Sequence, residues 1–275
     1  MSDKIFFDVV NMSITGSFAI LIIILVRLLL RKAPKVFSYT LWFVAFFRLL
    51  VPFSFESVLS ILPFNTMPLS TDMLYIETPC VETGIKAIDN VINPVVATEI
   101  LGSSVNVYQA FTFCGKIIWY IGVFIFLLHS IRSYFKLKEK LQNAVLLRDN
   151  IYITQTISTP FAIGLRNPKI YLPNNLASTQ EYVIAHEQAH LSRHDNLAKV
   201  IGYVILVLHW FNPLVWIAFK LFVTDMEMSC DESVIRKAKT DIRKEYSQSL
   251  LDLSIEKSTL GVPMAFAEGS PKERI

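Results

Sequence analysis

Three long apolar runs constrain this chain more than any other feature of its sequence. They cover residues 13–30, 36–55 and 111–130. Each is long enough to cross a hydrocarbon layer about 30 Å thick as a helix. Charged residues make up only 18% of the chain, against about 25% in typical soluble domains. The sequence therefore predicts a mainly α membrane protein with three transmembrane helices.

The charges between these runs predict an orientation. Basic segments follow the first run at 31–35 (RKAPK) and the third run at 131–140 (IRSYFKLKEK), whereas segment 56–108 carries six acidic residues against Lys86 alone. Because short basic loops stay in the cytoplasm, we expect the amino terminus and the acidic loop to lie outside. The chain after about residue 131 then starts inside a bacterial-type plasma membrane, and the protein is multi-pass.

These patterns divide the chain into four parts. We predict an amino-terminal transmembrane hairpin at 1–55, an extracellular acidic loop at 56–108 and a third transmembrane helix at 109–131. The remaining part, 132–275, is a cytoplasmic domain. The formal net charge of +3 is too small to indicate direct binding of nucleic acid, so the expected partners are the lipid bilayer and protein.

The cytoplasmic part has its own local signals. Residues 134–148 have the pattern of an amphipathic helix, and 151–154 and 169–172 have strand composition. The sequence STQE at 178–181 is a capping box, which predicts that a helix begins there. A fourth apolar run at 200–223 contains Pro213, and since proline breaks helices, we expect two helices packed against the membrane part.

The helix predicted after residue 178 carries HEQAHLSRHD at 186–195. On a helix, His186 and His190 share a face, so both rings can reach one zinc ion at about 2.0–2.1 Å. Glu187 is placed to take a proton from a water molecule that the metal activates. A catalytic zinc keeps three protein ligands, which makes Glu227 the candidate third ligand. Asp231, four residues later, can accept the other ring proton of a ligand histidine.

The motif has a plainer interpretation, because HExxH has few fixed positions and arises by chance on solvated helices. His194 lies too far along the helix to reach the same ion easily. We therefore expect it either to contact a ligand residue without binding the metal or to lie at the surface. Asp195 has two candidate roles, which are a salt bridge and the orientation of a metal ligand. Cys230 is a weaker candidate for the metal.

Four stretches resemble the BlaR/MecR-type family of integral-membrane zinc metallopeptidases: TPFAIGLRNPKIYLP (159–173), HEQAHLSRHDNL (186–197), HWFNPLVWIA (209–218) and DMEMSCDESVI (225–235). With the three spans and the outer loop, the resemblance covers nearly the whole chain. It implies a cytoplasmic α+β gluzincin-type zinc domain with membrane-associated helices near 200–223. It also implies His186, His190 and Glu227 as zinc ligands and Glu187 as the base. In the same resemblance, Asp231 contacts and orients a ligand histidine.

Sensor members of that family continue into an extracellular penicillin-binding domain, whereas this sequence ends at residue 275. It is either a fragment or a short member, and whether β-lactams are sensed is left open. The leading hypothesis is a zinc endopeptidase that cleaves a cytoplasmic protein in signal transduction. A transcriptional repressor and the chain itself are the candidate substrates, and a homodimer is left open. One alternative is a non-catalytic transducer with a structural zinc site. Another is a transporter, which is supported only by Arg48 and Lys116, the two charged residues inside the apolar runs at 36–55 and 111–130.

Overall fold

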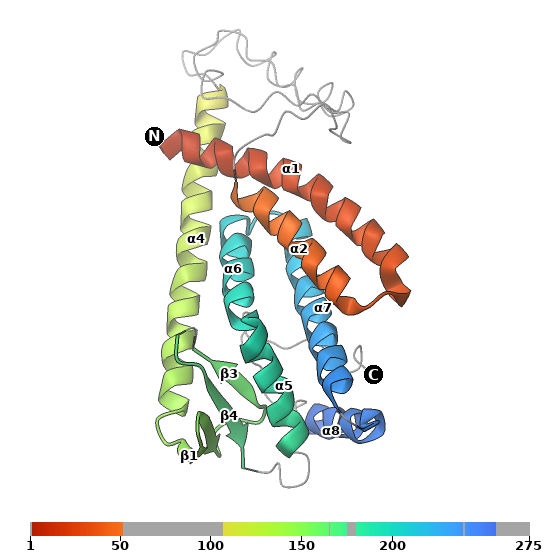
Figure 1. Cartoon of the computed structure of the whole chain (residues 1–275). Coiled ribbons are helices and arrows are strands. Elements are labelled where there is room, and N and C mark those ends of the chain that lie inside the picture. Colours follow the sequence, from red (N-terminus) through yellow and green to blue (C-terminus); the bar gives the residue numbers. More distant parts are fainter. Residues whose placement is uncertain (1, 52–106, 165, 175–179, 239, 257–275) are drawn as a thin grey trace.

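The structure is a computed structural model that describes residues 2–51, 107–164, 166–174, 180–238 and 240–256. Figure 1 shows two levels: a helical upper level with α1, α2, most of α4 and the α6–α7 turn, and a lower level with the sheet, α5 and α8. The expected acidic loop at 56–108 lies almost wholly outside the described residues.

Within the described residues, two helices have the length and composition to cross a membrane. They are α1 (Ser2–Leu29), which η1 (Leu30–Lys32) extends, and α4 (Val107–Lys140), with apolar windows inside Asp3–Lys32 and Gln109–Lys140. The third expected span is α2 (Lys35–Leu50), whose 16 residues cover about 24 Å. That is shorter than a hydrocarbon layer of about 30 Å, and the rest of the run at 36–55 lies outside the described residues.

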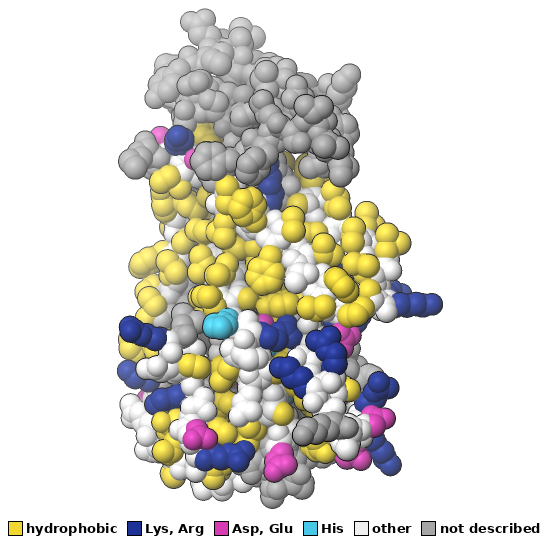
Figure 2. Space-filling model, in the orientation of Figure 1, with side chains coloured by type: hydrophobic (Ala, Val, Ile, Leu, Met, Phe, Trp, Pro, Cys, Tyr) yellow, Lys and Arg dark blue, Asp and Glu magenta, His cyan; other side chains and the backbone are white. Residues whose placement is uncertain are grey.

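The outer faces of these helices are apolar and unburied. Only 22% of the apolar window of α1 and 11% of that of α4 is buried, whereas the core helix of a soluble domain is mostly buried. Large exposed side chains include Leu25 and Leu29 on α1, Val44 on α2, and Phe111 and Phe124 on α4. Figure 2 shows hydrophobic side chains as a broad band above a region rich in charged groups. Apolar surfaces of this extent meet lipid or protein rather than water.

The fourth apolar run forms a helical hairpin, as predicted. Helix α6 (Asp195–Leu208) and α7 (Pro213–Lys237) are separated by a break just before Pro213. The turn lies beside the middle of α4, where Trp119 Nε1 donates to the carbonyl of Leu208 at 2.8 Å. Asn212 caps α7 with its side-chain oxygen and donates to Ser13 Oγ of α1 at 2.8 Å. Non-helical backbone at this depth is tolerated because protein groups satisfy it.

One hydrophobic core joins this hairpin to α1 and α2. Its fully buried members are Ile20, Trp42, Ala45, Ile205, Phe222 and Met226. A buried ion pair lies at its edge, where Arg27 Nε and Trp42 Nε1 both donate to Asp225 at 2.8 Å. The α1–α2 hairpin is therefore fixed to α7 only two residues before Glu227.

The lower level holds a four-stranded sheet in the order β1-β2-β4-β3. The strands are β1 (Val145–Arg148), β2 (Ile151–Thr154), β3 (Phe161–Ile163) and β4 (Lys169–Pro173). Strands β2 and β4 are parallel, and the other pairs are antiparallel. The strands expected at 151–154 and 169–172 are thus confirmed.

The prediction of one helix over residues 134–148 is wrong in its second half. Helix α4 runs on to Lys140, and residues 145–148 form β1 instead. The chain reverses at Asp149, which has φ 45°, a left-handed conformation that aspartate tolerates better than most residues. This turn pairs β1 with β2, and the pairing overrides the helical pattern of the sequence.

Two further helices complete the lower level. Helix α5 (Gln180–Arg193) carries the HEQAH sequence, and α8 (Arg243–Glu256) packs beside it through Tyr246. The first described residue of α5 is Gln180, so the beginning of the predicted capping box lies outside the described residues. Figure 1 shows α5 and the lower half of α7 side by side, below the level of α1 and α2.

Candidate metal centre

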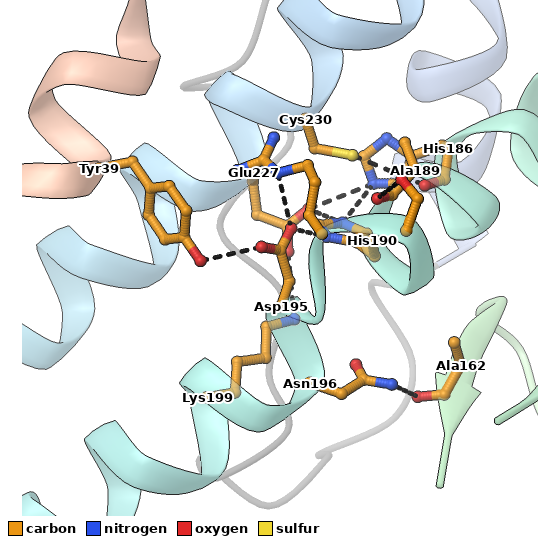
Figure 3. A network of polar contacts seen from close by, with 12 residues as sticks. Tyr39, Ala162, His186, Ala189, His190, Asp195, Asn196, Lys199, Glu227 and Cys230 are labelled. Atoms are coloured by element: carbon orange, nitrogen blue, oxygen red, sulfur yellow. Dashed lines mark hydrogen bonds and ion pairs between the residues drawn. The ribbon is translucent and has the colours of Figure 1, made fainter. Parts of the chain in front are cut away.

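Three predicted ligand atoms converge between α5 and α7. The Nε2 atoms of His186 and His190 are 3.0 Å apart, and Glu227 Oε2 lies 3.4 Å from each. The exposed fractions of the three residues are 7%, 5% and 0%, so the cluster is shielded from water. Figure 3 shows the two rings and the carboxylate pointing toward one another.

This triangle fits a tetrahedral metal ion. Ligand atoms about 2.0–2.1 Å from a zinc ion lie about 3.3–3.4 Å from one another. Two of the three separations, both 3.4 Å, have that value, and the third is shorter by a few tenths of an ångström. The donor set of two imidazoles and one carboxylate is that of catalytic zinc sites.

His186 is oriented by two groups on its far side. Its Nδ1 lies 2.8 Å from the hydroxyl of Tyr246 and 3.2 Å from Asp231 Oδ1. The Tyr246 hydroxyl donates to Asp231 at 2.6 Å, so its oxygen can only accept from the ring. The proton of the neutral ring is therefore on Nδ1, and Nε2 presents a lone pair to the cluster.

His190 is oriented by a second carboxylate. Its Nδ1 donates to Asp195 Oδ2 at 2.7 Å, which again leaves the Nε2 lone pair facing the cluster. Asp195 is fully buried, and its other oxygen accepts from the hydroxyl of Tyr39 at 2.8 Å. Arg193 Nε lies 3.4 Å from Asp195 Oδ2. A ring held in one orientation by a carboxylate is typical of metal-binding histidines.

Glu227 is held by a lysine that the sequence did not indicate. Lys199 Nζ on α6 donates to Glu227 Oε1 at 3.2 Å, while Oε2 faces the two imidazoles. A carboxylate with no exposed surface needs such partners, because burying an unpaired charge is costly. The lysine thus fixes which oxygen of Glu227 is directed toward the metal position.

The charges of the cluster favour a cation at its centre. Burial alone would lower the pKa of His186, but hydrogen bonds to Asp231, Cys230 and Glu227 outweigh it and raise the pKa well above 6.5. Burial would likewise raise the pKa of Glu227, yet the charges of Lys199 and His190 hold it well below 4.5. The site therefore stabilises positive charge between these groups, and a divalent cation bound there would supply that charge.

Cys230 is the competing third ligand. Its Sγ lies within 4.8 Å of a ring nitrogen of each histidine, and its thiol contacts the carbonyl of His186 at 3.6 Å. The 3.4 Å separations of Glu227 Oε2 match a coordination polyhedron more closely, and the carboxylate is held in place by Lys199. The geometry thus favours Glu227 over Cys230.

The remaining predicted residues divide into two groups. Glu187 is buried, with 4% exposure, and follows His186 directly on α5. Asp195 and Asp231 each contact one ring of the cluster. His194, by contrast, is exposed and has φ 58° at the amino-terminal cap of α6. Its backbone makes the hydrogen bonds of that cap, and the described structure does not bring its side chain into the site.

Sequence reasoning missed Tyr39, Tyr246 and Lys199. Tyr39 is 156 residues from Asp195, and Tyr246 is 60 residues from His186. No spacing rule connects residues so far apart. Lys199 offered a weak signal, because it lies one turn after Asp195 near the start of an apolar helix.

The family model for the BlaR1 peptidase M56 matches residues 7–275, which is nearly the whole chain. The Regulatory protein BlaR1 of Bacillus licheniformis is 29% identical over 209 residues, covering 63% of this chain and 35% of that protein. The Methicillin resistance mecR1 protein of Staphylococcus aureus is 24% identical over 276 residues, covering 89% and 46%. The chain thus spans between a third and a half of these relatives.

Proposed function

Because the chain belongs to the BlaR1 peptidase M56 family, we propose that it is a membrane-embedded zinc endopeptidase that cleaves a cytoplasmic protein in signal transduction. The observation that carries the proposal is the buried triangle of His186, His190 and Glu227, whose separations suit a tetrahedral ion. These three residues are the proposed ligands. A zinc ion held there supplies a Lewis acid that polarises a peptide carbonyl and activates water.

Glu187 is the proposed general base. It accepts a proton from the attacking water and then delivers it to the amine that leaves when the peptide C–N bond breaks. Only 4% of this residue is exposed, so its carboxylate is shielded from bulk water, which would otherwise compete for the transferred proton. Asp231 and Asp195 hold the two ligand rings through their Nδ1 protons, so the lone pairs of both Nε2 atoms stay directed at the ion.

The sheet offers a position for the substrate chain. Strand β3 is an edge of the sheet, with β4 as its neighbour. It lies close to the start of α6, where Asn196 Nδ2 donates to the carbonyl of Ala162 at 3.3 Å (Figure 3). A substrate in extended conformation can add to such an edge. The proposed substrates are a transcriptional repressor and the chain itself, in keeping with the name Regulatory protein that one relative carries.

We also propose the orientation predicted from the charges. We call residues 132–275 the peptidase part. The basic turn after α1 contacts it where the backbone N–H of Lys35 donates to Glu232 of α7 at 2.8 Å. The basic end of α4 leads directly into the sheet. Both basic segments therefore lie on the side of the metal centre, which supports a cytoplasmic peptidase domain and an amino terminus outside.

The test compares the parent chain with Glu187→Gln, using His194→Asn as the matched control. Asparagine tolerates the left-handed backbone of position 194, and that side chain lies outside the site. Zinc per chain and cleavage of a repressor fusion are measured on purified protein in lipid discs. One zinc in all three proteins, with cleavage lost only in Glu187→Gln, supports the proposal. One zinc and no cleavage by the parent favours the non-catalytic transducer.

A further inference from the structure

We propose that Tyr39, a residue of the membrane hairpin, is a positioning residue of the metal centre and acts through Asp195. This inference rests on the proposed metal site and deepens it. Tyr39 lies on α2 near the start of that helix and is 7% exposed. Its hydroxyl donates to Asp195 Oδ1 at 2.8 Å, while Asp195 Oδ2 accepts from His190 Nδ1 at 2.7 Å (Figure 3).

Asp195 needs both partners to hold one orientation. A carboxylate bonded through one oxygen can rotate about its last side-chain torsion, which is soft. With Tyr39 on one oxygen and His190 on the other, that rotation is blocked. Because Asp195 has no exposed surface, loss of the hydroxyl leaves a buried oxygen that water cannot easily satisfy. The predicted result is a displaced carboxylate and a less well aligned imidazole.

The hydroxyl of Tyr39 is itself held in place. The ring stacks on Phe222 of α7 with a centroid distance of 5.7 Å and an interplanar angle of 24°. Phe43 meets the ring edge-on at 5.4 Å. The guanidinium of Arg193 lies over the ring at 5.0 Å, a cation–π contact. Three helices thus fix the donor, which makes it a rigid reference for the metal ligand.

Helix α2 is in turn anchored to the peptidase part independently of Tyr39. Trp42, on the same helix, donates to Asp225 of α7 at 2.8 Å, and the backbone of Lys35 donates to Glu232. A movement of α2 relative to α5 and α7 therefore changes the distance between Tyr39 and Asp195. The chain needs its membrane hairpin to complete the support of His190.

The experiment uses Tyr39→Phe in the full chain in lipid discs, which keeps the ring and removes only the hydroxyl. Tyr203→Phe is the matched control, because its hydroxyl makes a 2.7 Å hydrogen bond to Ser130 between α6 and α4, away from the metal ligands. Zn²⁺ affinity is measured by competition with a chromophoric chelator, and the visible spectrum of the Co²⁺-loaded protein reports ligand geometry.

We expect Tyr39→Phe to weaken Zn²⁺ binding about 3–10-fold, at or below the lower end of the range for partners of metal ligands, and to change the Co²⁺ spectrum. Tyr203→Phe should leave both unchanged. In an Asp195→Asn background, Tyr39→Phe should add no further loss, since it acts through that carboxylate. This non-additivity separates positioning from a general loss of stability.

Two results overturn the inference. One is a parent-like affinity and spectrum for Tyr39→Phe, and the other is losses from Tyr39→Phe and Asp195→Asn that simply multiply. A parent chain that binds no Zn²⁺ removes the proposed function, and this inference with it. A parent that binds Zn²⁺ but cleaves nothing leaves the inference testable, because neither readout depends on proteolysis.

Discussion

The two histidines of the proposed metal centre are supported by the same kind of group from different parts of the molecule. His186 is backed by Asp231 and the hydroxyl of Tyr246, which come from α7 and α8 of the peptidase part. His190 is backed by Asp195 and the hydroxyl of Tyr39, which comes from α2 of the membrane hairpin. One proposed ligand is thus supported from α7 and α8, and the other is also supported from α2 of the α1–α2 hairpin.

This difference has a physical meaning for signalling. A displacement of α2 relative to α6 would lengthen the contact from Tyr39 to Asp195. The contacts of His186 with Asp231 and Tyr246 come from α7 and α8 and do not include a residue of α2. A site supported in this way can lose metal affinity or alignment without unfolding, because one of its supports comes from a helix that lies outside the peptidase part.

The largest expected effect comes from the proposed third metal ligand, Glu227. Replacing the third ligand with Glu227→Gln should weaken Zn²⁺ binding more than about 100-fold, beyond the 10–100-fold typical of outer partners. Chelator competition measures this, and Glu181→Gln, an exposed position on α5, is the control. If Glu227→Gln keeps parent affinity and Cys230→Ala loses it, the third ligand is Cys230 instead.

The next largest effects are expected from the carboxylates of Asp195 and Asp231. Asp195→Asn and Asp231→Asn should each weaken Zn²⁺ binding about 10–100-fold, since an amide cannot hold the Nδ1 proton as a carboxylate does. The same titration in detergent and in lipid discs sharpens the comparison. We expect the Asp231→Asn loss to be equal in both media and the Asp195→Asn loss to vary with them. Equal behaviour of the two variants would count against an asymmetric site.

A smaller effect compares the two tyrosines. Tyr246→Phe removes a hydroxyl that contacts both His186 and Asp231, whereas Tyr39 reaches His190 only through Asp195. The Tyr246→Phe loss of Zn²⁺ affinity should therefore be about 10-fold, larger than that of Tyr39→Phe. The chelator assay ranks the two variants, and the reverse order would show that the membrane support is the stronger one.

The smallest effect on metal binding is expected from the hairpin anchor. Arg27→Met removes one donor from buried Asp225 and leaves Trp42 in place, which should lower stability by about 1–3 kcal/mol. Zn²⁺ affinity should change less than about threefold, since Tyr39 keeps its contact. Chemical unfolding measures the first quantity, and Arg243→Met, in an exposed pair with Asp241, is the control. A large loss of affinity would mean that Arg27 itself positions the site.

The sequence by itself determined the local parts of this protein. Apolar runs and the break before Pro213 predicted α1, the core of α4 and the α6–α7 hairpin, because helix length and proline chemistry are local properties. Helical periodicity placed His186 and His190 on one face of α5, and the same periodicity set Asp231 one turn after Glu227. Local pattern failed at 145–148, where pairing with β2 decided the structure.

Only the tertiary structure decided how these parts meet. It brought Glu227 to within 3.4 Å of both imidazoles, although α5 and α7 are separated by a whole helix. It placed His194 outside the site, since the left-handed turn at φ 58° begins a new helix there. It also supplied Tyr39, Lys199 and Tyr246, whose partners lie 156, 28 and 60 residues away. Burial of the charged cluster requires such partners, but their identity depends on packing between distant helices, which no local pattern encodes.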